Sequence, residues 1–245
     1  MARKKAPARS PAGREKILDA AEELFAERGF FGVTMRQISL QAGVDVALPN
    51  YYFGSKQGLF DAVFLRRAEI LNALRSEALD RALAHAERGK PDLEMIIDAF
   101  LRPIRDAQSN SDPGWRNYCR LVALVNSSPV WARMMTSHFD GLVSKFVAAL
   151  RLAVPDVEMK ELYWAYHFLS GSLTLTMADT GRIDTLSGGL CHSQNARDAY
   201  SHMREFYSAA FAGLAGSRAG SPVKTSRRTK TGGRSSALSS RRTPS

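Results

Sequence analysis

Residues that start and stop helices recur at short intervals near the beginning of this chain, and they limit that segment to short helices. From residue 14 to 28, apolar side chains repeat every three or four positions, which is the spacing of one helix face. The stop and start signals that follow are Gly29, Thr34 with Gln37 as a capping box, Gly43, Asp45, and Gly54 with Ser55. They predict helices over 35–42 and 46–53 and a long helix after Ser55. Short helices joined by a glycine turn are typical of a helix-turn-helix unit.

The chain up to residue 215 keeps this helical periodicity, and no hairpin turn separates alternating apolar and polar runs. Proline and capping residues predict further helix starts at Asp92, Pro113 and Ser128. The expected helices cover residues 92–104, 115–125, 129–154, 158–177 and 195–215, with a glycine-rich connection over 181–189. The sequence therefore predicts an all-α fold.

Positive charge is concentrated at the two ends of the chain. The formal net charge is +10, from 34 basic and 24 acidic residues. Twelve of the basic residues lie in 1–13 and 216–245, which contain no acidic residue, so 22 basic residues face all 24 acidic ones in 14–215. Both ends have almost no large apolar side chain, which predicts a disordered arm over 1–13 and a disordered tail over 216–245. Because the body is nearly neutral, any DNA binding by it must come from a few specifically positioned contacts. The basic ends would add a salt-dependent attraction that does not depend on DNA sequence.

Motifs of enzymes, metal sites and membrane segments are missing from the sequence. It contains no Walker loop, G-x-S-x-G or H-E-x-x-H, and the two cysteines, Cys119 and Cys191, form no C-x-x-C. No apolar run reaches the roughly 18 residues of a membrane span, and no apolar region follows the basic N-terminus as in a secretory signal. We therefore expect a cytoplasmic protein that is not an enzyme and that has no metal and no cofactor.

The segment from Ile17 to Phe60 resembles the N-terminal DNA-binding domain of TetR-family transcriptional regulators. It carries the strings AAEELFAERGF, TMRQISLQAGV and YYFGSKQGLF in the order and spacing of that family, without a gap. The resemblance implies an all-helical dimer with two domains per subunit. The expected domains are a helix-turn-helix DNA-binding domain over 14–58 and a larger effector-binding and dimerisation domain over 59–215.

The resemblance also implies which residues contact DNA. By position, the contacts are Thr34, Arg36, Val46, Ala47, Leu48, Asn50, Tyr51, Tyr52 and Lys56. An asparagine pairs bidentately with adenine in the major groove, and small apolar side chains meet the thymine methyl group. Tyr51 and Tyr52 have an alternative role in the core. Pro49 departs from the aliphatic residue of most members, and we expect it to distort the start of its helix.

A wide stripe of aromatic and methionine side chains lies in the second domain. Together with neighbouring apolar residues it would line a cavity for a small effector, and the alternative is ordinary core packing. The candidate effector-binding residues are Phe100, Ile104, Tyr118, Val122, Trp131, Met134, Met135, His138 and Phe139. The last two helices are expected to pair with their twofold mates in a four-helix bundle. The candidate dimer residues are Tyr163, Tyr166, His167, Ser170, Met203, Phe206 and Phe211.

A second resemblance concerns the strings NYYFGSK and NYCRLVALVNSSP, at residues 50–56 and 117–129. They are similar to a subgroup of the family that responds to fatty acids or their coenzyme A esters. This resemblance implies an elongated apolar channel with an arginine near its mouth. The available arginines are Arg102, Arg105, Arg116 and Arg120.

The sequence thus predicts a sequence-specific DNA-binding regulator, a repressor released by a small apolar effector such as a fatty acid or acyl-CoA. The expected partners are double-stranded DNA with an inverted repeat, the effector and a second copy of the chain, and no membrane. Two alternatives stay open. One is an architectural DNA binder driven by the basic ends, which would not prefer a palindrome over scrambled DNA. The other is an enzyme or ligand carrier, whose activity would survive alanine at Tyr52 and Lys56.

Overall fold

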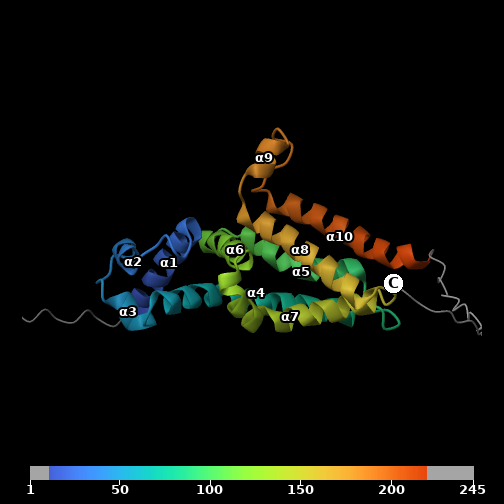
Figure 1. Cartoon of the computed structure of the whole chain (residues 1–245), viewed down its shortest axis with the longest axis horizontal. Helices are drawn as coiled ribbons and strands as arrows, with labels where there is room; N and C mark the ends of the chain where they lie inside the picture. The colour runs from blue at the N-terminus through green and yellow to red at the C-terminus, as the bar shows by residue number, and fades with distance from the viewer. Residues whose placement is uncertain (1–10, 220–245) are drawn as a thin grey trace, which may run out of the picture.

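The computed structural model describes residues 11–219, which form helices joined by loops in an elongated molecule (Figure 1). In chain order the elements are α1 (Pro11–Arg28), α2 (Met35–Ala42), α3 (Leu48–Phe53), α4 (Lys56–Ala84), α5 (Leu93–Gln108), α6 (Pro113–Asn126), the 3-10 turn η1 (Pro129–Trp131), α7 (Ala132–Ala153), α8 (Met159–Ala178), α9 (Arg182–Leu186) and α10 (Ala196–Ala219). Over the described range the backbone forms no β-strand, and one isolated bridge joins Glu87 to Lys90. The predicted all-α fold is confirmed.

The first three helices gather at one end of the molecule, where α4 begins (Figure 1). There α1 contacts α2, α3, α4 and α6, and α4 continues into the body to pack against α5, α6 and α7. α8 packs against α6, α7 and α10, and α9 projects from the body between α8 and α10 (Figure 1). One continuous cluster of buried apolar side chains joins both parts. Between residues 11 and 219, no helix combines the length and apolar composition needed to cross a bilayer.

The helix-turn-helix unit is held by the capping residues that the sequence predicts. Thr34 Oγ1 accepts a hydrogen bond from the Gln37 N–H at 3.3 Å, and Gln37 Oε1 accepts one from the Thr34 N–H at 2.8 Å. Gly43 ends α2 with a φ of +63°, a conformation that glycine adopts without strain. Ser55 Oγ accepts from the Gly58 N–H at 3.0 Å and caps α4. Each cap satisfies N–H groups that the first turn of a helix leaves unpaired.

The third helix begins two residues later than predicted. Asp45 Oδ1 accepts from the Ala47 N–H at 2.9 Å, and the Asp45 carbonyl accepts from the Leu48 N–H at 3.0 Å, so a turn precedes α3 and includes Val46. Pro49 is therefore the second residue of α3. Its missing N–H is one that the first helical turn leaves unpaired in any case. No distortion of α3 is needed to accommodate Pro49.

The structure also differs from the prediction at both ends of the described range. α1 begins at Pro11, inside the arm expected over 1–13, because the fixed φ of proline suits the first helical position. α10 continues to Ala219, inside the tail expected from residue 216, since each residue added to a formed helix gains a hydrogen bond. The rest of the predicted arm and tail, residues 1–10 and 220–245, lies outside the described residues.

Two predicted features of the second domain are corrected. Ser128 makes no side-chain cap, the 3-10 turn η1 follows it, and α7 starts at Ala132. The glycine-rich connection over 181–189 contains the short helix α9, which is flanked by glycines with positive φ.

Candidate nucleic-acid interface and ligand cavity

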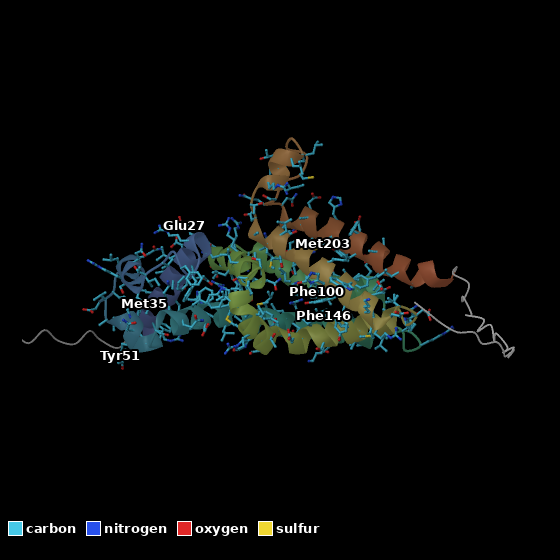
Figure 2. The ribbon with its side chains drawn as sticks, in the orientation of Figure 1. Glu27, Met35, Tyr51, Phe100, Phe146 and Met203 are labelled. Atoms are coloured by element: carbon cyan, nitrogen blue, oxygen red, sulfur yellow. The ribbon has the colours of Figure 1, made fainter. Side chains whose placement is uncertain are left out.

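Most side chains that the family resemblance assigns to DNA are exposed on α2, on the turn before α3, and on α3 itself. The six exposed residues are Thr34, Arg36, Val46, Ala47, Asn50 and Tyr51. Tyr51 is 57% exposed, and Figure 2 places it at the outer end of the α1–α3 unit. An aromatic side chain this exposed contributes little to the fold by burial, so its place on α3 makes it available to a partner.

The other three assigned residues are partly covered. Leu48 and Tyr52 are half-buried and pack against the hydrophobic core, which is the role that the sequence left open for Tyr52. Lys56 Nζ lies 4.4 Å from the centroid of the Phe30 ring, and burial lowers the pKa of this amine. Lys56 also lies in the first turn of α4, whose N–H groups favour an anion such as phosphate.

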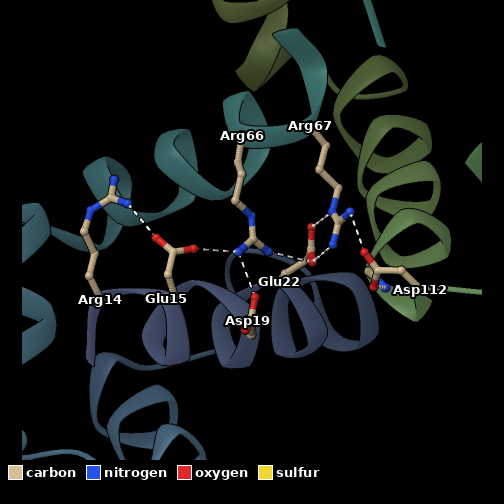
Figure 3. A network of polar contacts seen from close by, with 8 residues as sticks. Arg14, Glu15, Asp19, Glu22, Arg66, Arg67 and Asp112 are labelled. Atoms are coloured by element: carbon tan, nitrogen blue, oxygen red, sulfur yellow. Dashed lines mark hydrogen bonds and ion pairs between the residues drawn. The ribbon is translucent and has the colours of Figure 1, made fainter. Parts of the chain in front are cut away.

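A buried carboxylate joins three helices at the boundary between the two domains (Figure 3). Glu22 of α1 has a side chain only 3% exposed, and it accepts hydrogen bonds from two arginines of α4. Arg67 donates to its two oxygens at 2.7 and 3.1 Å, and Arg66 donates at 2.8 Å. Arg67 Nη1 also donates to Asp112, the N-cap of α6, at 2.9 Å. This network fixes α1, α4 and α6 relative to one another.

The surroundings of the network hold its charges in place. Burial by itself would lower the pKa of Arg67, but hydrogen bonds and charge from Glu22 and Asp112 raise it above its ordinary value. The pKa of Asp112 is lowered by the hydrogen bond from the Gly114 N–H and by Arg67. A Cβ at position 114 would lie 1.9 Å from Arg67 Nη2 and 2.6 Å from Glu22 Oε2. Glycine therefore lets α6 approach the network closely.

Trp131, a candidate effector residue, lies in an aromatic junction between the domains instead. Its ring stacks on Phe60 with centroids 4.4 Å apart and meets Phe30 edge-on at 5.1 Å. The 3-10 turn η1 places it there, next to the start of α4. Phe60 in turn contacts Phe64, and Phe64 contacts Tyr118 at 5.6 Å. The junction thus continues as packed rings into the second domain.

A cavity of about 250 Å³ lies between α4, α5, α6, α7 and α8. Six of the nine candidate effector residues line it: Phe100, Ile104, Tyr118, Val122, Met135 and Phe139. Met134 packs half-buried against the core, and His138 is exposed, with its carbonyl accepting from Asn72 Nδ2 at 3.0 Å. Both lie outside the cavity lining because α7 turns Met135 and Phe139, which are four residues apart, toward it.

An arginine that the sequence interpretation missed lines the same cavity. Arg75 of α4 is only 6% exposed, whereas an arginine on a long helix ordinarily indicates a solvent-facing position. The four arginines suggested by the subgroup resemblance lie elsewhere. Arg102 pairs with Asp98, Arg105 with Asp106 and Arg120 with Asp179, and Arg116 is exposed.

A wider groove adjoins the cavity on the side of α1. It measures about 760 Å³ and is lined by the last residues of α1, by Arg120 and its neighbours on α6, and by α8. The residues that line both spaces are Asn126, His167, Ser170 and Thr174. Asn126 Nδ2 donates to Thr174 Oγ1 at 2.6 Å, so this contact lies between groove and cavity.

The candidate dimer residues divide between an inner and an outer face. Met203 and Phe211 are buried within the subunit, because α10 packs this face against α5 and α8. The sequence left open which of the candidates face outward, and these two face inward in the single chain. Tyr166 is half-buried and lines the cavity, as do His167 and Ser170. Tyr163 and Phe206 are exposed.

The structure reveals an exposed apolar stripe on α8 that the sequence interpretation did not identify. Trp164, Phe168 and Leu175 are all more than half exposed, and Gly171 lies between the last two. Their spacing of four, three and four residues places them on one face of the helix. Phe206 of α10 is also 67% exposed. A large apolar surface of this kind is the usual mark of a protein–protein contact.

No metal site is formed by the residues that the structure describes: nowhere in 11–219 do three His, Cys, Asp or Glu side chains gather as ligands. Cys119 is buried, which raises the pKa of its thiol, and Cys191 is exposed near α9. Neither cysteine is among the residues that line the cavity, although Cys119 directly follows Tyr118, which does line it.

Comparison with known proteins finds family matches in two parts of the chain. A family model described as bacterial regulatory proteins, tetR family, matches residues 17–63, and one described as tetracyclin repressor-like, C-terminal domain, matches 98–210. The HTH-type transcriptional regulator BetI of Rhizobium meliloti is 38% identical over 115 residues, which are 42% of this chain and 55% of that protein. The chain thus aligns with little more than half the length of this curated relative. BetI of Burkholderia lata is 23% identical over 60% of this chain and 73% of its own length.

Solved structures agree on the fold. A TetR-like transcriptional regulator from Rhodococcus sp. RHA1 superposes with a TM-score of 0.56, covering 82% of this chain and 96% of its own, at 18% identity. Salmonella enterica GusR superposes with a TM-score of 0.55, covering 86% of this chain and 100% of its own, also at 18% identity. At this level of identity the similarity concerns the fold.

Proposed function

This chain belongs to the TetR family of bacterial transcriptional regulators, and from that premise we propose that it is a dimeric repressor whose operator affinity is controlled by a small effector. The observation that carries the proposal is the capped helix-turn-helix unit. Its α3 presents Asn50 and Tyr51 to the outside, while Leu48 and Pro49 anchor it to the core. This geometry suits α3 for the major groove, with the exposed Thr34 and Arg36 at the start of α2 beside the phosphate backbone. A bacterial repressor acts on chromosomal DNA, so we place the protein in the cytoplasm.

The exposed stripe on α8 supports the dimer. Paired with its twofold copy, and with Phe206 of α10 at its side, it would bury Trp164, Phe168 and Leu175 in an isologous interface. Two α3 helices must lie about one DNA turn apart, roughly 34–36 Å, to reach successive major grooves. The interface therefore sets the spacing on which operator affinity depends.

The cavity supports control by an effector. It is lined by Tyr118 and Val122 of α6, and the same helix begins at Asp112, which is joined through Arg67 to Glu22 of α1. An effector that shifts α6 or α4 thereby moves α1 and the DNA-binding domain. It releases DNA to the extent that it binds the shifted arrangement more tightly than the DNA-bound one.

Selection of bound sequences from a random duplex pool at physiological salt tests the proposal. We expect the full chain to enrich an inverted repeat with half-sites on one face of the helix. An unenriched pool from folded protein would contradict the proposal and favour sequence-blind binding by the basic ends.

Replacing Asn50 with alanine is expected to reduce discrimination at one operator position. A bidentate contact between asparagine and adenine contributes about 1–3 kcal/mol of base discrimination, so the preference there should fall roughly 5- to 150-fold. Competition binding with single-base operator variants measures the effect. Lys56→Ala is the contrasting variant, since loss of a phosphate contact weakens all sequences alike and lowers the salt slope by about 1. If Asn50→Ala lowered affinity by the same factor for every single-base operator variant, Asn50 would not take part in base recognition.

A further inference from the structure

Arg75 is a buried cation without a counterion. It projects from α4 into the centre of the second domain and is 6% exposed. Among the residues of the described range, no carboxylate pairs with it, and its Nε is sealed from solvent without a hydrogen-bond partner. Burial lowers the pKa of Arg75 to about 10, so the side chain still carries its charge at neutral pH.

Aromatic rings only partly compensate this charge. The guanidinium carbon lies 4.0 Å from the Phe100 centroid and 5.4 Å from the Phe146 centroid, and the two rings meet edge-on in the middle of the body (Figure 2). Stacking on a ring stabilises a cation but offers no hydrogen-bond acceptor in place of lost water. Buried charges in proteins are ordinarily paired or hydrogen-bonded. Residues 11–219 supply no hydrogen-bond acceptor for Arg75 Nε and no counterion, which points to a bound ligand as the partner.

The wall beside Arg75 offers a second unpaired polar group. Tyr118 lines the same cavity, and its hydroxyl is buried without a hydrogen-bond partner. Toward α5 and α7 the lining is apolar except for Asp140, with Phe100, Ile104 and Phe139 among its residues. A cationic donor and a hydroxyl donor at an apolar wall match a ligand with an oxyanion at one end and a hydrocarbon body.

The size of the cavity limits that ligand. About 250 Å³ is room for roughly eight water-sized groups, at about 30 Å³ for each water of the liquid. Hexanoate, with eight non-hydrogen atoms, meets this limit, whereas a coenzyme A ester is several times larger.

We propose that the effector is a small apolar carboxylate whose oxyanion is bound by the Arg75 guanidinium and the Tyr118 hydroxyl. This inference rests on the proposed function of the cavity as an effector site. It assigns Arg75, rather than the four arginines near the surface, as the determinant of ligand charge. The carboxylate ties α4 to α6, the two helices that the Glu22 network joins to α1.

One acidic residue also lines the cavity and makes the assignment of charge testable. Asp140 of α7 is exposed, and its carboxylate opposes an anionic ligand but would favour a cationic one. Removing this charge therefore changes affinity in opposite directions for ligands of opposite charge.

Calorimetric titration of the full chain with three matched probes tests the proposal: hexanoate, hexanamide and hexylammonium. We expect hexanoate to bind at least tenfold more tightly than hexanamide, and hexylammonium more weakly still. Arg75→Met, which keeps an unbranched stem but removes the charged guanidinium, should abolish the preference for hexanoate over hexanamide. Tyr118→Phe should weaken hexanoate binding several-fold, and Asp140→Asn should strengthen it. Arg133→Met, at an exposed arginine of α7, should leave hexanoate binding unchanged.

Several outcomes would overturn the inference. These are equal binding of hexanoate and hexanamide, tighter binding of hexylammonium, no binding of hexanoate, or full hexanoate binding by folded Arg75→Met. The comparison among the three probes uses only the unmodified chain. It therefore tests the proposed charge of the ligand even where a variant fails to fold. Operator binding measured in parallel separates the two proposals. Operator binding without carboxylate binding refutes this inference alone, and carboxylate binding without operator binding refutes the proposed function alone.

Discussion

Replacing Glu22 with glutamine is expected to lower the free energy of unfolding by about 3–5 kcal/mol, the usual effect of removing one partner from a buried ion pair. Glu22 is the carboxylate on which both Arg66 and Arg67 converge, with donor–acceptor distances of 2.7 to 3.1 Å. The glutamine amide keeps the shape of the Glu22 carboxylate but lacks its negative charge. Its NH₂ group is a donor, so it cannot accept a hydrogen bond from the arginine N–H groups. Arg66 and Arg67 would keep Asp19 and Asp112 as partners, but both would lose the buried negative charge at a boundary with little solvent. Urea unfolding measures the loss.

Glu27→Gln is the matched control on the same helix. Glu27 contacts Arg28 at 3.2 Å, with both side chains about half exposed, and an exposed pair of this kind contributes about 0–1 kcal/mol. Equal and small losses in the two variants would show that the Glu22 network does not hold the domains together.

Replacing Phe168 with glutamate is expected to dissociate the dimer and abolish tight operator binding. Phe168 lies in the middle of the exposed stripe on α8, so the proposed interface would bury two copies of the new carboxylate. The 27.0 kDa chain should sediment as a monomer. Because a monomer reaches only one half-site, operator affinity should fall by roughly 10²- to 10⁴-fold, the range by which linked sites exceed single ones.

Leu152→Glu supplies the comparison for this variant. Leu152 is 53% exposed on α7, a different helix from the one that carries the stripe, and its substitution should leave both the dimer and operator affinity intact. A dimeric Phe168→Glu protein would place the subunit interface elsewhere on the molecule.

The local features of the fold could be predicted because they depend on neighbouring residues. The capping box of Thr34 and Gln37, the left-handed Gly43 and the Ser55 cap each act within a few positions of the chain. The same local logic errs where two signals compete. Asp45 caps a turn rather than the helix itself, so α3 begins at Leu48, with Pro49 in its first turn.

Features that depend on how helices rotate against one another could not be predicted. Apolar residues occur on both faces of α10, and only its packing against α5 and α8 shows that Met203 and Phe211 point inward while Phe206 points outward. Trp131 fits the α7 pattern in sequence but belongs to the 3-10 turn before it. Periodicity identifies an amphipathic helix, yet it does not specify which neighbour covers each face.

Buried charges were the hardest part of the site to predict. Arg75 and Glu22 have the ordinary appearance of solvent-facing residues on amphipathic helices. Their burial follows from contacts with distant residues. Arg75 packs on Phe100, 25 positions away, and Glu22 is linked through Arg67 to Asp112, 90 positions away. No local pattern carries that information.

Operator binding as a function of half-site spacing tests the central claim most directly. The full chain is titrated with the selected inverted repeat and with copies in which five base pairs, about half a helical turn, are inserted between the half-sites. A dimer with two fixed α3 helices predicts that the insertion reduces affinity to that of a lone half-site. Affinity that is indifferent to the spacing would contradict a dimer that reads two half-sites at once.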